Sequence, residues 1–330
     1  MSLVAGSYER FIWGFKLKTL KHSTETLTLS PIFTFPSHLS PIKSVAVSGC
    51  LAVSGGSDDT IKIYDLSTSS EIGSLNDPTS TITSLCLYTP QTTVTSFPRN
   101  LFSAYDDGYI SIYDADPFVH LKRIKVHKQG VNDMCVHPSG KLALTVGIDS
   151  CLGMVNLVRG RKSFSFRLGE EALLVEYDTS GDKFFMGMDD KVSAHDAESA
   201  KLIVDMEAEK RIICIAPGTN GLLYTGGEDR NLTAWDTVSG KVAYCIEDAH
   251  SARLKGIVVL SKIDGTHDDQ PFLVASASSD GIIRVWDVRM ATKGKATPLA
   301  EAKTKSRLTC LAGSSIKSMK KRFGGFSRSN

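Results

Sequence analysis

The sequence predicts an all-β protein: a seven-bladed β-propeller whose ring is closed by pairing the C-terminal strand with the N-terminal hairpin. Three observations support this fold class. A strand–turn–strand motif recurs seven times, a short apolar run accompanies the motifs, and half a repeat is left over at each chain end. Self-similarity at a fixed period of about 20–50 residues is the sequence signature of propellers and other repeat proteins.

The motif is clearest at residues 276–288, where SASSDGIIRVWDV indicates a strand, a tight turn at Asp280-Gly281, and a second strand ending in Trp286-Asp287. The seven terminal pairs lie at residues 13–14, 64–65, 113–114, 155–156, 195–196, 235–236 and 286–287. In six copies an aspartate, which can accept hydrogen bonds from the backbone N–H groups of a tight turn, stands six positions earlier. These residues are Asp58, Asp107, Asp149, Asp189, Asp229 and Asp280.

Short apolar runs lie between the motifs and are rich in Val, Ile, Leu and Cys, as expected of strands buried on both faces. They span residues 42–47, 82–87, 131–136, 172–177, 212–217, 254–259 and 308–313. Each period therefore supplies four short strands, named a to d in chain order, which suits a propeller blade of about 40–45 residues. The repeat resembles the WD40 repeat, and the resemblance covers residues 1–315, which we expect to form one propeller.

The two chain ends each hold an incomplete repeat. The chain starts within a b strand, at residues 3–7, and ends with an a strand, at 308–313, that no hairpin follows. We therefore expect the last strand to pair with the N-terminal hairpin, so that both ends of the chain build one blade. Closing the ring in this way also removes exposed sheet edges.

Three units are longer than the others. Their extra residues fall in the a–b connections at 88–100 and 261–271 and in the c–d connection at 17–31. Because neighbouring strands of a blade are antiparallel, all three insertions should project from the same face of the ring. Repeat proteins often place insertions on a binding face, but loop length also drifts neutrally, and the sequence leaves both interpretations open.

The composition is that of an ordinary globular protein, with 42% hydrophobic and 22% charged residues. The sequence has no stretch of 18 apolar residues, so we expect no transmembrane helix. The first residues do not resemble a secretory signal. The seven cysteines include no C-x-x-C pair, which argues against a disulfide framework or a zinc site. We expect reduced cysteines, no cofactor, no metal, no membrane contact and no small-molecule substrate.

The C-terminal end is a separate basic segment. Of the 38 Lys and Arg residues, eight lie from residue 302 onward, where there is no acid; residues 1–301 then hold 30 basic and 36 acidic residues. Residues 316–330 are expected to be a disordered tail that contacts RNA or directs nuclear import, or is merely a solubilising end. Its candidate residues are Lys317, Lys320, Lys321, Arg322 and Arg328.

The resemblance to WD40 repeats implies hydrogen-bonded polar sets that hold the blades together: a His, a strand-b Ser or Thr, the turn Asp and the Trp. His250, Ser276, Asp280 and Trp286 match the full set. Partial matches are His38 with Asp58, His127 with Asp149, and Asp229 with Trp235. A His-Ser-Asp trio also occurs in hydrolases, but here the positions recur with the repeat, which favours a structural role.

Motifs of nucleotide-binding proteins, zinc proteases and serine hydrolases are absent: no G-x-x-x-x-G-K-[ST], G-x-G-x-x-G, H-E-x-x-H or G-x-S-x-G occurs. The glycines of SGGSDD, at 54–59, suit turn geometry better than a phosphate cradle. We therefore expect a protein that is not an enzyme.

Two segments resemble one family in particular. HPSGKLALTVGIDSCLGMVNLVRGRKSF, at 137–164, and VAGSYERFIWGFKL, at 4–17, are similar to the p21-activated-kinase-interacting WD40 family, which includes the yeast maintenance-of-killer ribosome biogenesis factor. Val155 and Gly153 depart from that family, which tends to carry Trp and a basic residue there.

The resemblance implies a scaffold of the nucleus, mainly the nucleolus, that is needed for rRNA processing and maturation of the large (60S) ribosomal subunit. Its implied partners are pre-60S ribosomal proteins and assembly factors, and also ribosomal RNA. The alternative that it implies is a negative regulator that binds a p21-activated kinase.

Overall fold

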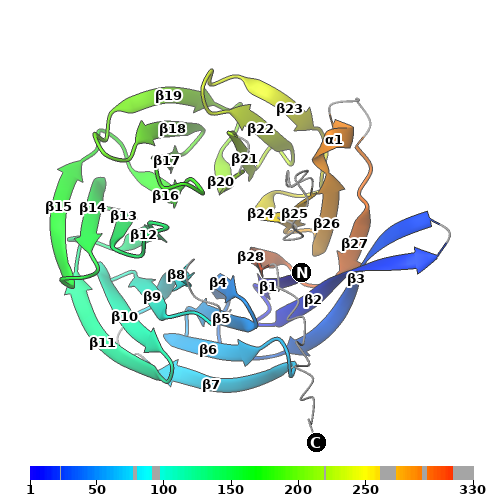
Figure 1. Cartoon of the computed structure of the whole chain (residues 1–330), viewed down its shortest axis with the longest axis horizontal. Coiled ribbons are helices and arrows are strands. Elements are labelled where there is room, and N and C mark those ends of the chain that lie inside the picture. The colour runs from blue at the N-terminus through cyan, green and yellow to red at the C-terminus, as the bar shows by residue number, and fades with distance from the viewer. Residues whose placement is uncertain are drawn as a thin grey trace, which may run out of the picture.

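The computed structural model describes residues 1–22, 24–76, 80–90, 97–218, 221–260, 273–291 and 296–314. Over these residues the chain forms seven four-stranded antiparallel sheets that stand around a ring (Figure 1). Among them, the one helix is α1 (Val288–Ala291), a single turn after the last c strand. The prediction of an all-β, seven-bladed propeller is confirmed.

Each blade runs from an innermost a strand to an outermost d strand (Figure 1). The a strands are β4 (Ile42–Ser48), β8 (Ile82–Tyr88), β12 (Val131–Val136), β16 (Ala172–Tyr177), β20 (Ile212–Pro217), β24 (Leu254–Leu260) and β28 (Leu308–Ser314). The b strands are β1 (Ser2–Ser7), β5 (Leu51–Gly56), β9 (Asn100–Tyr105), β13 (Leu142–Gly147), β17 (Lys183–Met188), β21 (Leu222–Gly227) and β25 (Leu273–Ser278).

The two outer strands of each blade complete the sheets. The c strands are β2 (Ile12–His22), β6 (Thr60–Asp65), β10 (Tyr109–Ala115), β14 (Cys151–Asn156), β18 (Lys191–Asp196), β22 (Leu232–Asp236) and β26 (Ile282–Asp287). The d strands are β3 (Thr24–Phe35), β7 (Ser70–Asn76), β11 (Phe118–Lys125), β15 (Arg161–Arg167), β19 (Leu202–Glu207), β23 (Val242–Ile246) and β27 (Ala300–Lys303). Blade 1 consists of β28 and β1–β3, and blades 2 to 7 follow in chain order.

Burial is greatest at the b strands and falls toward the rim, whereas the a strands are partly open to the ring axis. The b strands β1, β5 and β25 are buried at every position, because the neighbouring blades cover both of their faces. The d strand β15, at the rim, is exposed at most positions. This gradient explains why the inner strands are nearly all apolar or small, whereas the rim strands carry the charges.

The ring closes where the sequence predicts. β28 pairs antiparallel with β1, in a register that places Ser314 opposite Ser2 and Leu308 opposite Ser7. Strands from the two chain ends thus lie side by side in blade 1 (Figure 1). The last described residue is Ser314, so the basic tail lies outside the described residues.

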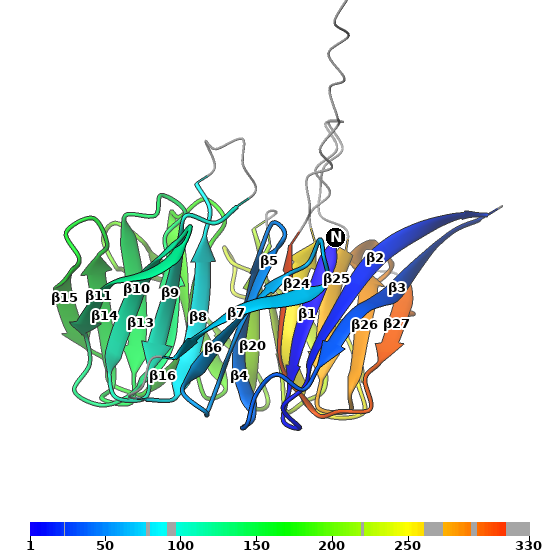
Figure 2. The ribbon, with the colours of Figure 1, turned by 90° about the horizontal axis from the view of Figure 1, so that it is seen from below.

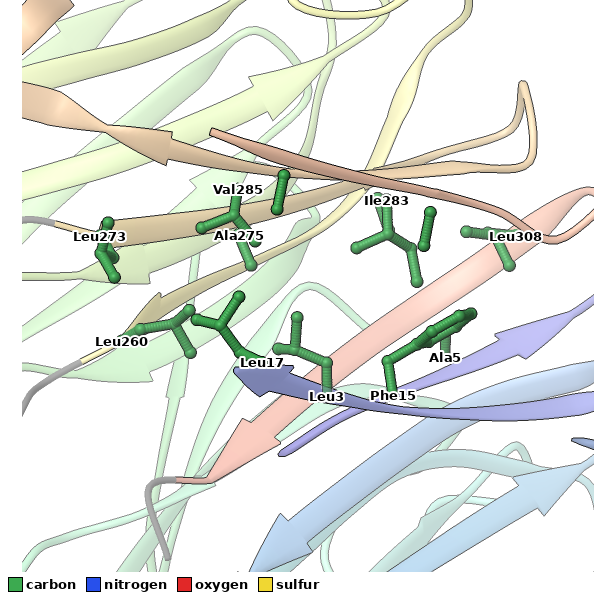
Figure 3. Packing of buried hydrophobic residues seen from close by; sticks show 13 residues of the cluster. Leu3, Ala5, Phe15, Leu17, Leu260, Leu273, Ala275, Ile283, Val285 and Leu308 are labelled. Atoms are coloured by element: carbon green, nitrogen blue, oxygen red, sulfur yellow. The ribbon is translucent and has the colours of Figure 1, made fainter. Parts of the chain in front are cut away.

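A hydrophobic cluster joins the closing blade to blade 7 (Figure 3). Leu308 of β28 is 1% exposed and shares this cluster with Leu3 of β1 and Ile283 of β26. The innermost strands also approach closely: a Cβ on Gly256 of β24 would lie 2.7 Å from the backbone nitrogen of Leu311. Closure therefore depends on both backbone pairing and side-chain packing across the blade 7–blade 1 boundary.

The insertion at 17–31 is built into longer strands. β2 has 11 residues and β3 has 12, and their pairing continues to His22 opposite Thr24. The resulting ribbon reaches beyond the body, toward the face at which the a strand β8 ends (Figure 2). Much of the other two insertions, residues 91–96 and 261–272, lies outside the described residues.

We expect truncation after residue 306 to destabilise the whole ring. It removes β28, which exposes the edge of β1 and opens the cluster around Leu308. Losing one large core side chain alone costs about 2–5 kcal/mol, and this truncation removes several contacts at once. Thermal unfolding followed by circular dichroism should show a large drop in Tm or no cooperative transition.

The matched control is a chain that lacks only residues 316–330, which follow β28. Its Tm should equal that of the full chain, since every described blade strand is retained. Equal stability of the two truncated chains would contradict closure by β28.

Candidate interaction sites

The most complete polar set lies within blade 7. His250 Nε2 is 2.8 Å from Ser276 Oγ, and Trp286 Nε1 donates to the same oxygen at 2.8 Å. The other ring nitrogen, Nδ1, lies 3.2 Å from the Asp280 carboxylate. That carboxylate also accepts from the backbone N–H of Ser251 at 3.1 Å. The four side chains therefore connect the segment before β24 to strands β25 and β26.

Blade 2 repeats this arrangement with a tyrosine. His38 Nε2 lies 2.7 Å from Ser54 Oγ, and His38 Nδ1 lies 3.0 Å from Asp58. Tyr64, at the aromatic slot, places its hydroxyl 3.0 Å from Ser54 Oγ. The hydroxyl group thus takes the place of the indole N–H of the tryptophan.

Blade 4 carries the histidine without an aromatic partner. His127 lies 2.9 Å from Thr145 Oγ1 and 2.8 Å from Asp149. With Val155 at the slot, the Thr145 hydroxyl donates to the Gly153 carbonyl at 3.2 Å. A Cβ on Gly153 would lie 2.7 Å from Thr145 Oγ1. Gly153 and Val155, the two residues that depart from the family pattern, therefore both lie on β14.

Blade 6 keeps the tryptophan and lacks the histidine. Trp235 Nε1 donates to Thr225 Oγ1 at 2.8 Å. His250 stands four residues before β24, and Ala208 stands at the same place before β20. Asp229 instead caps its own turn by accepting the Asn231 N–H at 3.3 Å. Asp229 and Trp235 are thus not joined by a histidine.

The pKa of each turn aspartate depends on whether a histidine contacts it. Burial alone would raise the pKa of Asp58, Asp149 and Asp280, but hydrogen bonds from histidine and backbone N–H groups hold each pKa below its usual value. Burial raises the pKa of Asp229, which has no histidine partner. Burial also lowers the pKa of His38, which favours its neutral form. These groups satisfy one another inside the blades and present no free nucleophile.

A second site lies on the ring axis. A cavity of about 280 Å³ is lined by residues of β4, β8, β12, β16, β20, β24 and β28, the innermost strands in Figure 1. Asp133 of β12 and Glu176 of β16 line it. Burial raises the pKa of Asp133 to about 6, and burial with the nearby Asp133 charge raises the pKa of Glu176 to about 8.

Neither carboxylate is among the site residues predicted from the sequence. A signal was present: the third and fifth positions of the a strands are otherwise Ser, Cys, Gly, Ala, Val or Leu. Asp133 and Glu176 are the two acidic exceptions in that pattern. Their proximity could not be read from it, because they belong to different repeats.

A third feature is a cavity of about 650 Å³ between blades 4 and 5. Its wall includes Leu144, Met154 and Phe184, and the half-exposed Phe164 on the rim strand β15. Asp196 and neighbouring residues of the c–d connection border it. With apolar walls and acidic groups at its border, the cavity can receive an apolar side chain of a partner protein.

The other expected features concern the cysteines, metal binding, membrane spans and the basic tail. All seven cysteines are free thiols. In the described ranges, no group of three or more His, Cys, Asp or Glu is placed to hold a metal, and no helix could span a membrane. The candidate tail residues Lys317, Lys320, Lys321, Arg322 and Arg328 lie outside the described residues.

Comparison with known proteins identifies similar chains. The family model for the WD domain, G-beta repeat, matches residues 29–65, 118–154 and 248–287. The p21-activated protein kinase-interacting protein 1-like of Danio rerio is 34% identical over 94% of this chain and 80% of its own length. Shk1 kinase-binding protein 15 of Schizosaccharomyces pombe is 28% identical (87% and 77%), and Protein MAK11 of Saccharomyces cerevisiae is 27% identical (94% and 82%).

We expect Asp280→Asn to lower the free energy of unfolding by about 1–3 kcal/mol at pH 7, because it weakens a buried, charge-assisted hydrogen bond to His250. The folded-state pKa of Asp280 is lowered, so its stabilisation is present above its usual pKa of about 4 and is lost as the pH falls below that value. Urea unfolding at pH 7 and at lower pH should show the difference shrink in acid.

Asp189→Asn is the matched control. Asp189 holds the same turn position in blade 5, but its side chain is 77% exposed and pairs with the exposed Arg211 at 3.4 Å. Its substitution should change stability by less than about 0.5 kcal/mol. Equal effects of the two substitutions would show that the histidine contact adds nothing to stability.

Proposed function

The chain belongs to the WD40 family of p21-activated protein kinase-interacting protein 1, and from this premise we propose that it is a non-enzymatic scaffold for assembly of the 60S ribosomal subunit. One observation supports a binding role above all. The recurring His, Ser or Thr, and Asp side chains are engaged in holding blades together, as in blades 2, 4 and 7. The loops, the rim and the channel are left as surfaces for partners.

The ribosomal assignment is supported by similarity. The segments 137–164 and 4–17 resemble a family that includes a ribosome biogenesis factor, and the chain is similar to Protein MAK11 over most of its length. We place the protein in the nucleus, mainly in the nucleolus. Its proposed partners are pre-60S ribosomal proteins and assembly factors, with ribosomal RNA contacted through the basic residues of 316–330.

Kinase regulation is the second candidate. It is favoured by relatives named for binding a kinase: p21-activated protein kinase-interacting protein 1-like and Shk1 kinase-binding protein 15. In this alternative the propeller binds and inhibits a p21-activated kinase. The apolar cavity between blades 4 and 5 would suit a short kinase segment.

Depletion of the protein in its own cells should lower 60S subunits relative to 40S subunits and leave large-subunit rRNA precursors unprocessed. The reason is that a missing scaffold leaves its partners unassembled. Sucrose-gradient profiles and hybridisation to precursor rRNA measure both effects, and a normal profile after complete depletion would exclude the role.

Re-expression separates the contributions of the parts. The full chain should restore the 60S peak. A chain without residues 316–330 that folds but does not accumulate in the nucleus would assign nuclear import to the basic tail. If it accumulates normally but restores less of the 60S peak, an RNA contact of the tail is favoured.

For the kinase alternative, the purified protein should bind a p21-activated kinase and lower its rate of substrate phosphorylation. Pull-down and a phosphate-transfer assay test this directly. Phe164→Asp, which places a charge at the half-exposed edge of the cavity between blades 4 and 5, should weaken the binding, whereas Glu207→Gln on the rim of blade 5 should not. Absence of both binding and inhibition would exclude this role.

A further inference from the structure

The channel on the ring axis holds two carboxylates from neighbouring blades. Asp133 of β12 and Glu176 of β16 both line the cavity of about 280 Å³. That volume lies below the ~300–1,000 Å³ usual for sites of drug-sized ligands, so it suits a single side chain. Its wall also contains Leu85, Met134 and Leu174, which can cover an aliphatic chain.

The two carboxylates differ in their hydrogen bonds. Asp133 accepts from Ser84 Oγ at 2.8 Å, from its neighbour Met134 N–H at 2.8 Å, and from Val175 N–H at 3.1 Å. Glu176 accepts no hydrogen bond from any residue in the described part of the chain. Glu176 is partly buried and lines the open channel, where its carboxylate can accept hydrogen bonds from a ligand.

The described residues of the channel wall do not supply a cation for Glu176. Lys255 of β24 lines the same cavity, but it forms no ion pair with Glu176 among the described residues. The charges that act on Lys255 are those of Arg253, Cys214, Arg211 and Glu228, and Glu176 is not among them. Within the described part of the chain, the acidic side of the channel therefore has no paired cation.

We propose that the central channel binds one arginine side chain of a partner protein, with Glu176 as its main acceptor and Asp133 beside it. A guanidinium group donates two parallel hydrogen bonds to a carboxylate, while its three methylene groups lie against the apolar wall. The inference deepens the scaffold role and does not depend on whether the partner belongs to the ribosome or is a kinase.

Binding should be linked to pH through Glu176. The other titratable groups that line the channel are Asp133, Cys86, Cys135, Cys214, Lys255 and Cys310. Burial raises the pKa of each of these four thiols, to about 11 for Cys310 and about 12 for Cys86, so they stay neutral below pH 9. With its pKa raised to about 8, Glu176 is protonated in most molecules at pH 7, and a guanidinium selects the ionised form.

The direct test is a titration of the ¹⁵N-labelled full chain with N-acetyl-L-arginine methylamide, followed by NMR. The backbone amides of Met134 and Val175 report on the site, because both donate to Asp133. N-acetyl-L-citrulline methylamide has the same shape without the charge. We expect saturable shifts with the arginine compound alone, and a Kd about tenfold lower at pH 9 than at pH 7.

Glu176→Gln keeps the size of the side chain and removes its charge, so it should weaken binding at pH 9 at least about tenfold. Glu207→Gln, on the exposed rim strand of the same blade, should bind as the unmodified chain does. Circular dichroism of both variants tests whether they fold. Should Glu176→Gln not fold, the arginine–citrulline comparison on the unmodified chain decides.

The proposal is overturned by absence of saturable shifts at pH 9, by equal binding of citrulline, or by unchanged binding to folded Glu176→Gln. These outcomes concern the site alone. A normal ribosome profile after depletion would remove the 60S role and leave the channel site in place.

Discussion

The rest of the structure depends on the pairing of β28 with β1, which joins residues near position 310 to residues near position 4. A propeller blade cannot bury its own faces, so each blade is stable only between two neighbours. Without the closing pair, blades 1 and 7 would each expose an apolar face and blade 1 an unpaired edge. One strand therefore determines whether the seven-blade ring is complete.

The polar sets inside the blades show how a fold can use hydrolase-like residues without hydrolase chemistry. His250 is within hydrogen-bond distance of both Ser276 and Asp280, yet Trp286 donates to the serine oxygen that a nucleophile would need free. The same residue types in blades 2 and 4 take the same places. Repetition of the arrangement, with every group paired, is what favours a structural role.

The channel carboxylates represent the opposite case. Asp133 has three donors, whereas Glu176 has none among the described residues. Inside a blade, an unpaired polar group would lower the stability of the fold and could not gain a partner. A group that faces a cavity can form hydrogen bonds with a ligand that enters it. A scaffold can in this way keep rigid blades and still hold one position ready for a partner.

Much of the fold followed from the sequence by itself: the period, the turn aspartates and the count of strands predict seven blades and closure by 308–313. These features can be read from the sequence because each hairpin forms from residues that are adjacent in the chain. Tertiary structure alone decided which side chains meet on the ring axis. Asp133 and Glu176 are 43 residues apart in the chain. They become neighbours because each a strand turns the same positions toward the axis. Burial there raises the pKa of both groups, and the charge of Asp133 raises that of Glu176 further.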